Sequence, residues 1–99
     1  MGKVLFSIRY EINPEEKDNF TNVVRELKNI VAADGLESYH VYECKNKKNC
    51  YEEVYTFDTM ESFENFDDNN DERVNLLTNK LTDMVKEHST QYKVLNEIL

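Results

Sequence analysis

The sequence predicts an α+β fold in which four strands and two helices follow one another in the order βαββαβ. Three observations support it: one face of residues 3–12 is wholly apolar, two later stretches place apolar residues three and four apart, and two segments rich in Tyr, Val and Thr flank a short polar loop. A period of two indicates a strand, and a spacing of three and four indicates an amphipathic helix. At 99 residues, the chain has the length of a single domain, residues 1–99.

The first strand, residues 3–12, has one apolar face and one mixed face. The apolar face carries Val4, Phe6, Ile8, Tyr10 and Ile12, and the mixed face carries Leu5, Ser7, Arg9 and Glu11. The apolar face is the one that we expect the helices to cover, because it has no side chain that needs water.

The first helix is expected to begin directly after this strand. Asn13 can cap it, Pro14 suits its first position, and Glu16 completes a capping box. Its apolar stripe continues to Val31, and Asp34-Gly35 is a typical C-terminal stop.

Residues 36–44 and 50–57 are predicted to form a hairpin about the polar loop 45–49. If Cys44 lies opposite Cys50, the pairs on the helix side are Glu43 with Tyr51, Val41 with Glu53, Tyr39 with Tyr55 and Glu37 with Phe57. The pairs on the other face are then Tyr42 with Glu52, His40 with Val54 and Ser38 with Thr56. A slip of one residue would exchange the two faces.

The second helix is predicted to be kinked or broken. Thr59 can cap a short segment that carries Phe63 and Phe66, and an acidic, Asn-rich stretch over residues 67–72 interrupts it. Apolar residues spaced by three and four then resume, with His88 expected near the helix end, and residues 92–99 close the chain as a strand. This order is the ferredoxin-like arrangement, a four-stranded antiparallel sheet with two helices on one face.

The sheet face away from the helices is too apolar to be left in water and too polar for a dry core. It carries Arg9, His40, Tyr42 and Val54 on the expected register, and pairing with a second copy would cover it. We therefore expect a homodimer with these four residues at the interface. His40 could titrate there and Arg9 could hold an anion, or both could make ordinary interface hydrogen bonds.

A net charge of −8 excludes several classes of partner. Nucleic acids and anionic membrane surfaces attract basic proteins, so neither is expected. No spacing of residues suits a metal site, and Cys44 and Cys50 have neither a zinc-site nor a redox motif around them. We expect no cofactor, a cytoplasmic location and two cysteines that act as small buried apolar residues.

The order of elements, the turn over residues 34–39 and the segment YEEVYTFDTMESFENF over residues 51–66 carry a resemblance to a known family. Together they resemble the antibiotic-biosynthesis-monooxygenase-like domains of the dimeric α/β-barrel superfamily, over nearly the whole chain. The resemblance implies two copies joined sheet to sheet. Where such domains work without metals or prosthetic groups, they oxidise electron-rich phenolic or quinol-like molecules in a pocket between sheet and helices.

The chain departs from the family pattern at three positions. Phe57 stands where many members have Trp, Phe66 where they commonly have His, and Ile8 where the haem-degrading branch has Asn. A haem site would lack both its axial ligand and its polar group on the first strand, so haem chemistry is not expected.

The candidate site residues follow from the faces and from this resemblance. An apolar chamber for an aromatic ligand would be lined by Phe6, Ile8, Tyr10, Tyr39, Tyr55, Phe57, Phe63 and Phe66, which could equally form an ordinary aromatic core. Glu53 is the candidate catalytic residue, because a carboxyl buried among aromatic rings has a raised pKa and can exchange a proton. A register error or a position at the sheet edge would instead leave it in water. Two hypotheses follow: a small cofactor-independent oxygenase, or a non-catalytic dimer that binds a small ligand or an accessory partner.

Overall fold

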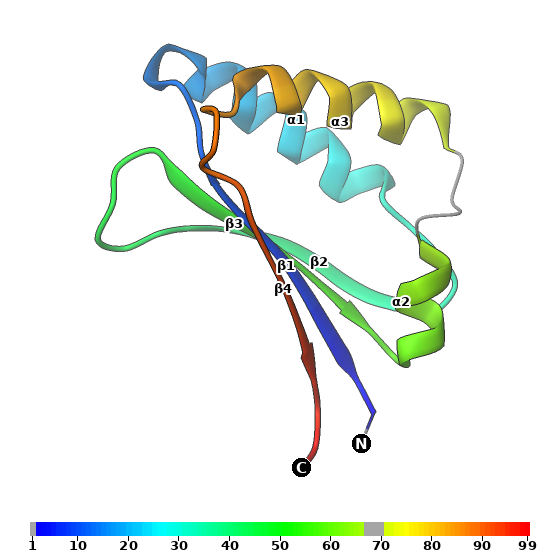
Figure 1. Cartoon of the computed structure of the whole chain (residues 1–99). Coiled ribbons are helices and arrows are strands. Elements are labelled where there is room, and N and C mark those ends of the chain that lie inside the picture. The colour runs from blue at the N-terminus through cyan, green and yellow to red at the C-terminus, as the bar shows by residue number, and fades with distance from the viewer. Residues whose placement is uncertain (1, 67–70) are drawn as a thin grey trace.

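The computed structural model describes residues 2–66 and 71–99, which form a sheet covered on one face by helices (Figure 1). The elements are β1 (Val4–Glu11), a 3-10 turn (Pro14–Glu16), α1 (Lys17–Ile30), β2 (Leu36–Glu43), β3 (Cys50–Phe57), α2 (Met60–Phe66), α3 (Glu72–Met84) and β4 (Gln91–Asn96). The four strands are antiparallel and lie in the order β2-β3-β1-β4. The ferredoxin-like α+β fold predicted from the sequence is confirmed.

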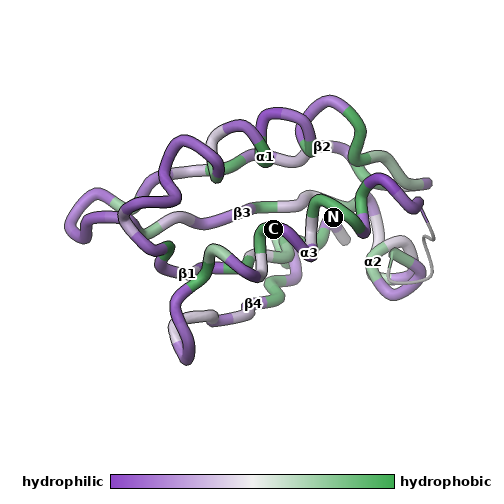
Figure 2. Tube along the Cα trace, turned by 90° about the horizontal axis from the view of Figure 1, so that it is seen from above, coloured by the Kyte–Doolittle hydropathy of each residue, from purple (hydrophilic) through white to green (hydrophobic). Residues whose placement is uncertain are grey.

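The helices pack over the apolar face of the sheet. α1 and α3 lie side by side above it, and α2 sits at the end where β3 finishes (Figure 1). Apolar and polar stretches alternate along both long helices in Figure 2, as expected for helices with one buried side. The largest fully buried side chains are Phe20, Phe57, Ile12, Leu27, Leu77 and Val4.

The start and the end of α1 differ from the predicted ones. The Asn13 side chain caps nothing; instead, the Glu16 N–H donates to the Asn13 carbonyl over 2.9 Å, which closes a 3-10 turn, so α1 begins only at Lys17. At the other end, Val31 is already extended. Gly35, with φ of +82°, forms the turn into β2 rather than a helix cap.

The hairpin register is confirmed except at its far end. Glu53 pairs with Val41, as expected, and the Cys44 N–H donates to the Cys50 carbonyl over 2.9 Å. Phe57, however, pairs with Leu36 and not with Glu37, because a bulge at Glu37 shifts the ladder by one residue. The carboxylate of Glu37 accepts a hydrogen bond from Lys3 Nζ over 2.7 Å.

The second helix is broken into α2 and α3. Thr59 Oγ1 accepts from the Ser62 N–H over 3.1 Å, which confirms the predicted cap of α2. Asp71, from the acidic stretch, caps α3 by accepting from two backbone N–H groups. The rest of that stretch, residues 67–70, lies outside the described residues. His88 lies four residues beyond α3 with φ of +63°, so its predicted place at the helix end was wrong.

Candidate functional site

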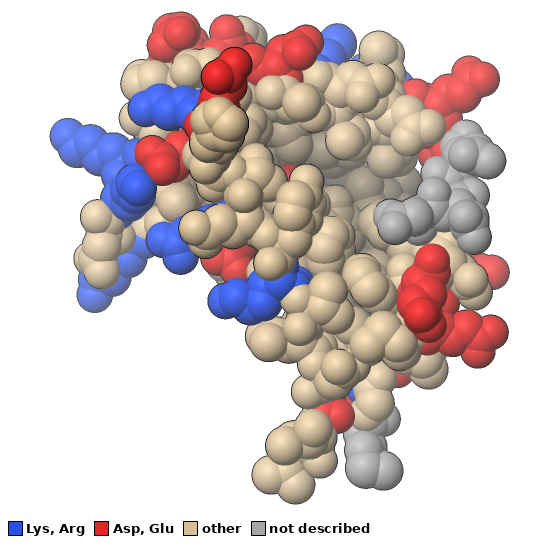
Figure 3. Space-filling view, in the orientation of Figure 1, with Lys and Arg blue, Asp and Glu red and all other residues tan. Residues whose placement is uncertain are grey.

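A cavity opens between α3 and the sheet, along the edge formed by β4. It consists of two adjoining hollows of about 340 and 280 Å³, which share Ile8 from β1, Thr78 from α3 and Tyr92 from β4. In Figure 3 it is visible as a recess beneath the helices, surrounded mainly by uncharged side chains. Pockets that hold small organic ligands typically measure about 300–1,000 Å³, so an aromatic ring fits this one.

The two hollows differ in chemistry. The smaller one has no charged residue in its lining, which includes the aromatic residues Phe6, Tyr55 and Phe66 and the polar residues Asn75 and Thr78. The larger one carries more polar groups, with Glu53 and Tyr10 on the sheet side, Thr78 and Thr82 on α3, and Lys86, Glu87, His88 and Thr90 from the turn that precedes β4. A ligand lying across both would therefore have an apolar end and a polar end.

Glu53 is buried at the centre of the sheet, with only 3% of its surface exposed. Its Oε1 accepts a hydrogen bond from the Tyr39 hydroxyl over 2.6 Å. Burial raises the pKa of the Glu53 carboxyl, and this effect outweighs the hydroxyls of Tyr39, Tyr10 and Tyr55, which lower it. The structure therefore places on the cavity wall a carboxyl that loses its proton less readily than an exposed one.

The three tyrosines around Glu53 keep their protons. Burial raises the pKa of Tyr10, Tyr39 and Tyr55, and the nearby Glu53 carboxylate raises each of them further. At neutral pH their hydroxyls can therefore donate hydrogen bonds, and they cannot act as bases.

Fewer of the predicted lining residues border the cavity than the sequence indicated. Phe6, Ile8, Tyr10, Tyr55 and Phe66 line one hollow or the other. Tyr39, Phe57 and Phe63 line neither of them. Phe57 is fully buried, and its ring packs edge-on against Phe63 and Phe66 at centroid distances of 5.6 and 5.2 Å. These side chains belong to the core, and Tyr39 reaches the site only through its bond to Glu53.

The wall at the mouth of the cavity was not predicted from the sequence. It is the turn from Lys86 to Thr90, which Ser89 fixes to β1: the Ser89 hydroxyl accepts from the Glu11 N–H over 3.1 Å and donates to the Lys86 carbonyl over 2.7 Å. Turn residues show no periodic pattern, so only the polar threonines on the apolar stripe of α3 could have indicated which face of that helix borders a cavity.

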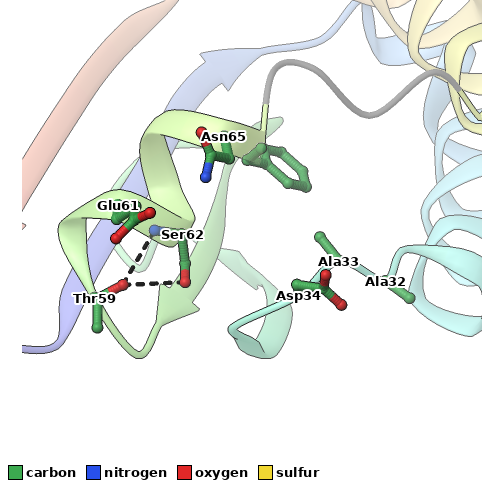
Figure 4. A pocket seen from close by; sticks show the side chains of 8 residues that line it. Ala32, Ala33, Asp34, Thr59, Glu61, Ser62 and Asn65 are labelled. Atoms are coloured by element: carbon green, nitrogen blue, oxygen red, sulfur yellow. Dashed lines mark hydrogen bonds between the residues drawn. The ribbon is translucent and has the colours of Figure 1, made fainter.

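A third hollow, of about 440 Å³, lies between the turn after α1 and α2 (Figure 4). Two of its polar residues are already hydrogen-bonded within the protein. Thr59 Oγ1 donates to Ser62 Oγ over 3.1 Å, and Ser62 Oγ donates to Asp58 over 2.6 Å. Glu53 does not line it. It offers a ligand fewer apolar contacts, so the cavity beside Glu53 is the better candidate.

The opposite face of the sheet carries the four residues expected at a dimer interface. Arg9, His40, Tyr42 and Val54 share it by register, together with Leu5 and Leu95. Leu5, Tyr42 and Leu95 are 37%, 54% and 50% exposed. His40 Nδ1 lies 2.9 Å from Lys28 Nζ, which also donates to the Tyr39 carbonyl.

Both cysteines are free thiols on this face. Cys50 is buried, and burial together with the neighbouring Cys50 thiol raises the pKa of Cys44 to about 11. A thiol with so high a pKa is a poor nucleophile, which agrees with the expected structural role.

In the described ranges, 2–66 and 71–99, no group of three or more His, Cys, Asp or Glu side chains is arranged to hold a metal ion. No helix in the same ranges combines the length and the hydropathy needed to span a bilayer.

No protein-family model and no curated protein matches the sequence. Solved structures match it over almost its whole length. A proposed antibiotic biosynthesis monooxygenase from Caulobacter crescentus superposes with a TM-score of 0.83 at 12% identity, covering 99% of this chain and 92% of its own. The chain has the same fold as this structure. A conserved protein from Methanosarcina mazei gives 0.82 at 13% identity, covering 98% and 94% of the two chains.

Another solved structure with this fold is named as an oxygenase. It is a single-residue variant of SnoaB, a cofactor-independent oxygenase from Streptomyces nogalater, with a TM-score of 0.77, 11% identity, and coverage of 100% of this chain and 96% of its own. At such identities the likeness establishes the fold, and the activity has to be argued from the residues of the site.

Proposed function

We propose that this protein is a cofactor-independent oxygenase that acts on an electron-rich aromatic molecule, of phenolic or quinol type, in the cavity between α3 and the sheet. The observation that carries the proposal is Glu53, a buried carboxyl on the wall of an apolar cavity that is large enough for an aromatic ring. Burial raises the pKa of Glu53 toward neutral pH. A group exchanges protons most effectively when its pKa lies near the pH of the solution.

The proposed chemistry needs a substrate that can itself supply electrons to dioxygen. Loss of a proton from a phenol or an activated methylene leaves an electron-rich anion, and Glu53 is placed to accept that proton. For an activated methylene, the balance is one methylene and one dioxygen giving one carbonyl and one water. All four electrons then come from the substrate, so no external reductant is consumed.

The surroundings of Glu53 suit this role. Tyr39 holds Oε1 and so fixes the direction of the carboxyl, and Phe6 and Tyr55 supply apolar surface in the adjoining hollow. The same two side chains offer flat contacts to an aromatic ring.

The direct test is an oxygen-uptake screen with phenols, hydroquinones and anthrones, combined with product analysis. We expect uptake with at least one of these substrates, without added metal, flavin or haem, and one product formed per dioxygen consumed. If no member of the panel gives uptake above the rate without protein, the oxygenase proposal is wrong.

A non-catalytic ligand-binding protein is the second candidate. It is favoured by the packing of Phe57 and Phe63 in the core, which leaves the cavity narrower than the expected chamber. A binder would be stabilised in a saturable way by members of the panel, because a ligand that binds only the native state raises its apparent stability, but it would consume no oxygen.

We also propose that two copies pair through the sheet face opposite the helices. The support is the exposure of Leu5, Tyr42 and Leu95 on a face that also carries the partly buried Val54. Exposed apolar groups gathered on one sheet face are typical of protein interfaces.

Replacing Val54 by Lys is expected to convert the dimer into a monomer. A charge at the centre of a sheet-to-sheet interface would be desolvated without a partner, at a cost of several kcal/mol. Light scattering coupled to size exclusion measures the change. Leu76→Lys is the control, because Leu76 is an exposed apolar residue on α3, away from this face. A Val54→Lys protein that stays dimeric at unchanged stability would contradict the proposed interface.

A further inference from the structure

The Tyr10 hydroxyl stands out among the polar groups of the cavity. Tyr10 is 2% exposed, its side chain lines the larger hollow, and its ring packs edge-on against Phe20 at 6.0 Å between centroids. Among the side chains of residues 2–66 and 71–99, its hydroxyl is the buried polar atom without a hydrogen-bond partner. Buried polar groups in proteins nearly always have a partner, so this one needs an explanation.

The neighbours of Tyr10 do not satisfy its hydroxyl. Glu53 lies close enough for the two groups to shift each other's pKa, but they form no hydrogen bond of good geometry, and Glu53 Oε1 already accepts from Tyr39. The other sheet residues that line this hollow are Ile8, which has no polar side-chain atom, and Tyr92, which forms no hydrogen bond with the Tyr10 hydroxyl. The hydroxyl is therefore an unsatisfied donor of a residue that lines the cavity, and a ligand oxygen that reached it would complete its hydrogen bonding.

Charge limits the kind of ligand that it could receive. The basic side chains that line this hollow, Lys86 and His88, belong to the exposed turn at the mouth, and the titratable group beside Tyr10 is the acidic Glu53. An anionic ligand group at Tyr10 would lie next to a carboxyl with no buried cation to balance it. Such an arrangement is unfavourable in a site of low dielectric constant.

We propose that Tyr10 is a ligand-orienting residue, whose hydroxyl donates a hydrogen bond to an uncharged oxygen of the substrate, a ketone or a phenolic hydroxyl. This inference rests on the proposed function, since it takes the same cavity as the substrate site. It adds a selection rule: the protein prefers aromatic molecules with an uncharged acceptor oxygen to hydrocarbons and carboxylates of the same shape. Held in this way, the substrate oxygen would lie beside Glu53.

The test compares probes that differ only at the oxygen. We expect α-tetralone to bind about tenfold more tightly than tetralin, because one hydrogen bond to an otherwise unsatisfied donor is gained. α-Naphthoate should bind more weakly than α-naphthol. Tyr10→Phe should bind α-tetralone and tetralin about equally, with its affinity for tetralin unchanged from the parent protein. Isothermal titration calorimetry on the intact protein measures each dissociation constant.

Tyr51→Phe is the matched control. Tyr51 pairs with Tyr10 across β1 and β3 and is also buried, but it does not line the cavity. This variant should keep the preference for the ketone. Because Tyr10→Phe removes a buried hydroxyl that has no partner, its melting temperature should not fall below that of the parent protein.

The outcomes separate this inference from the function on which it rests. If the parent binds ketone and hydrocarbon equally, or Tyr10→Phe keeps the preference, the role of Tyr10 is overturned and the cavity still stands as an aromatic site. If neither probe binds, the cavity is not an aromatic site, which overturns both proposals.

Discussion

Replacing Glu53 by Gln is expected to lower turnover of the substrate found in the oxygen-uptake screen by about 100-fold or more, the usual contribution of a positioned proton carrier. Gln keeps the size and shape of the side chain and can still accept from Tyr39, so the cavity should persist. Steady-state oxygen uptake measures the loss. Glu52→Gln is the control, because Glu52 lies next along β3 and points to the opposite face. Equal turnover in parent and Glu53→Gln would remove Glu53 from the mechanism.

The same variant also has an expected pH signature. The folded-state pKa of Glu53 is raised above the unfolded value of about 4.3, so the native state retains a proton that the unfolded state releases. This contribution to stability is complete below that unfolded value and is lost as the pH rises through the folded pKa. The free energy of unfolding of Glu53→Gln should therefore fall less than that of the parent over this interval. Urea unfolding at acid and neutral pH measures the difference, and superimposable curves would mean that Glu53 is solvated.

Gly35→Ala is expected to destabilise the fold by about 2–5 kcal/mol. Gly35 has φ of +82°, a conformation that costs other residues about 1–2 kcal/mol. An added Cβ would also overlap the side chains of Ser62 and Asp58, and relieving such an overlap typically costs another 1–3 kcal/mol, about the same again. Urea unfolding of the variant measures the loss.

Gly2→Ala separates the two causes. Gly2 has φ of +93°, but an added Cβ there would meet nothing within 4 Å. We expect this variant to lose much less stability than Gly35→Ala. Equal losses, or no loss at Gly35, would show that the close approach of the turn to α2 contributes nothing.

The fold could be predicted because its main signals are local. The apolar alternation of β1 and the spacing of apolar residues in α1 and α3 are properties of neighbouring residues, and the length of the loop fixes the hairpin register near it. That register alone placed Glu53 on the face covered by helices, where the structure has it. The bulge at Glu37 escaped prediction because it depends on how the chain enters β2 from the Gly35 turn.

The site could be predicted only in part, because a pattern shows which face a side chain takes but not whether it meets a void or another side chain. Tyr10 and Phe57 both lie on the covered face, yet one borders the cavity and the other is packed between rings. Hydrogen bonding cannot be predicted from the pattern either. The sequence places several tyrosines near Glu53, but only the structure shows that Tyr39 is hydrogen-bonded to it and Tyr10 is not.

The strand β4 has a consequence for access to the cavity. All six of its side chains are exposed, so it is attached to the sheet mainly by backbone hydrogen bonds to β1 and by the stacking of Tyr92 on Phe6. Detaching an edge strand of this kind uncovers little apolar surface, so it requires much less free energy than unfolding the whole chain. β4, which carries Tyr92, can therefore detach transiently while β1 and β3 stay paired. The amide hydrogens of β4 should then exchange with solvent well before those of β1 and β3. Each such opening would widen the mouth of the cavity on the side of β4.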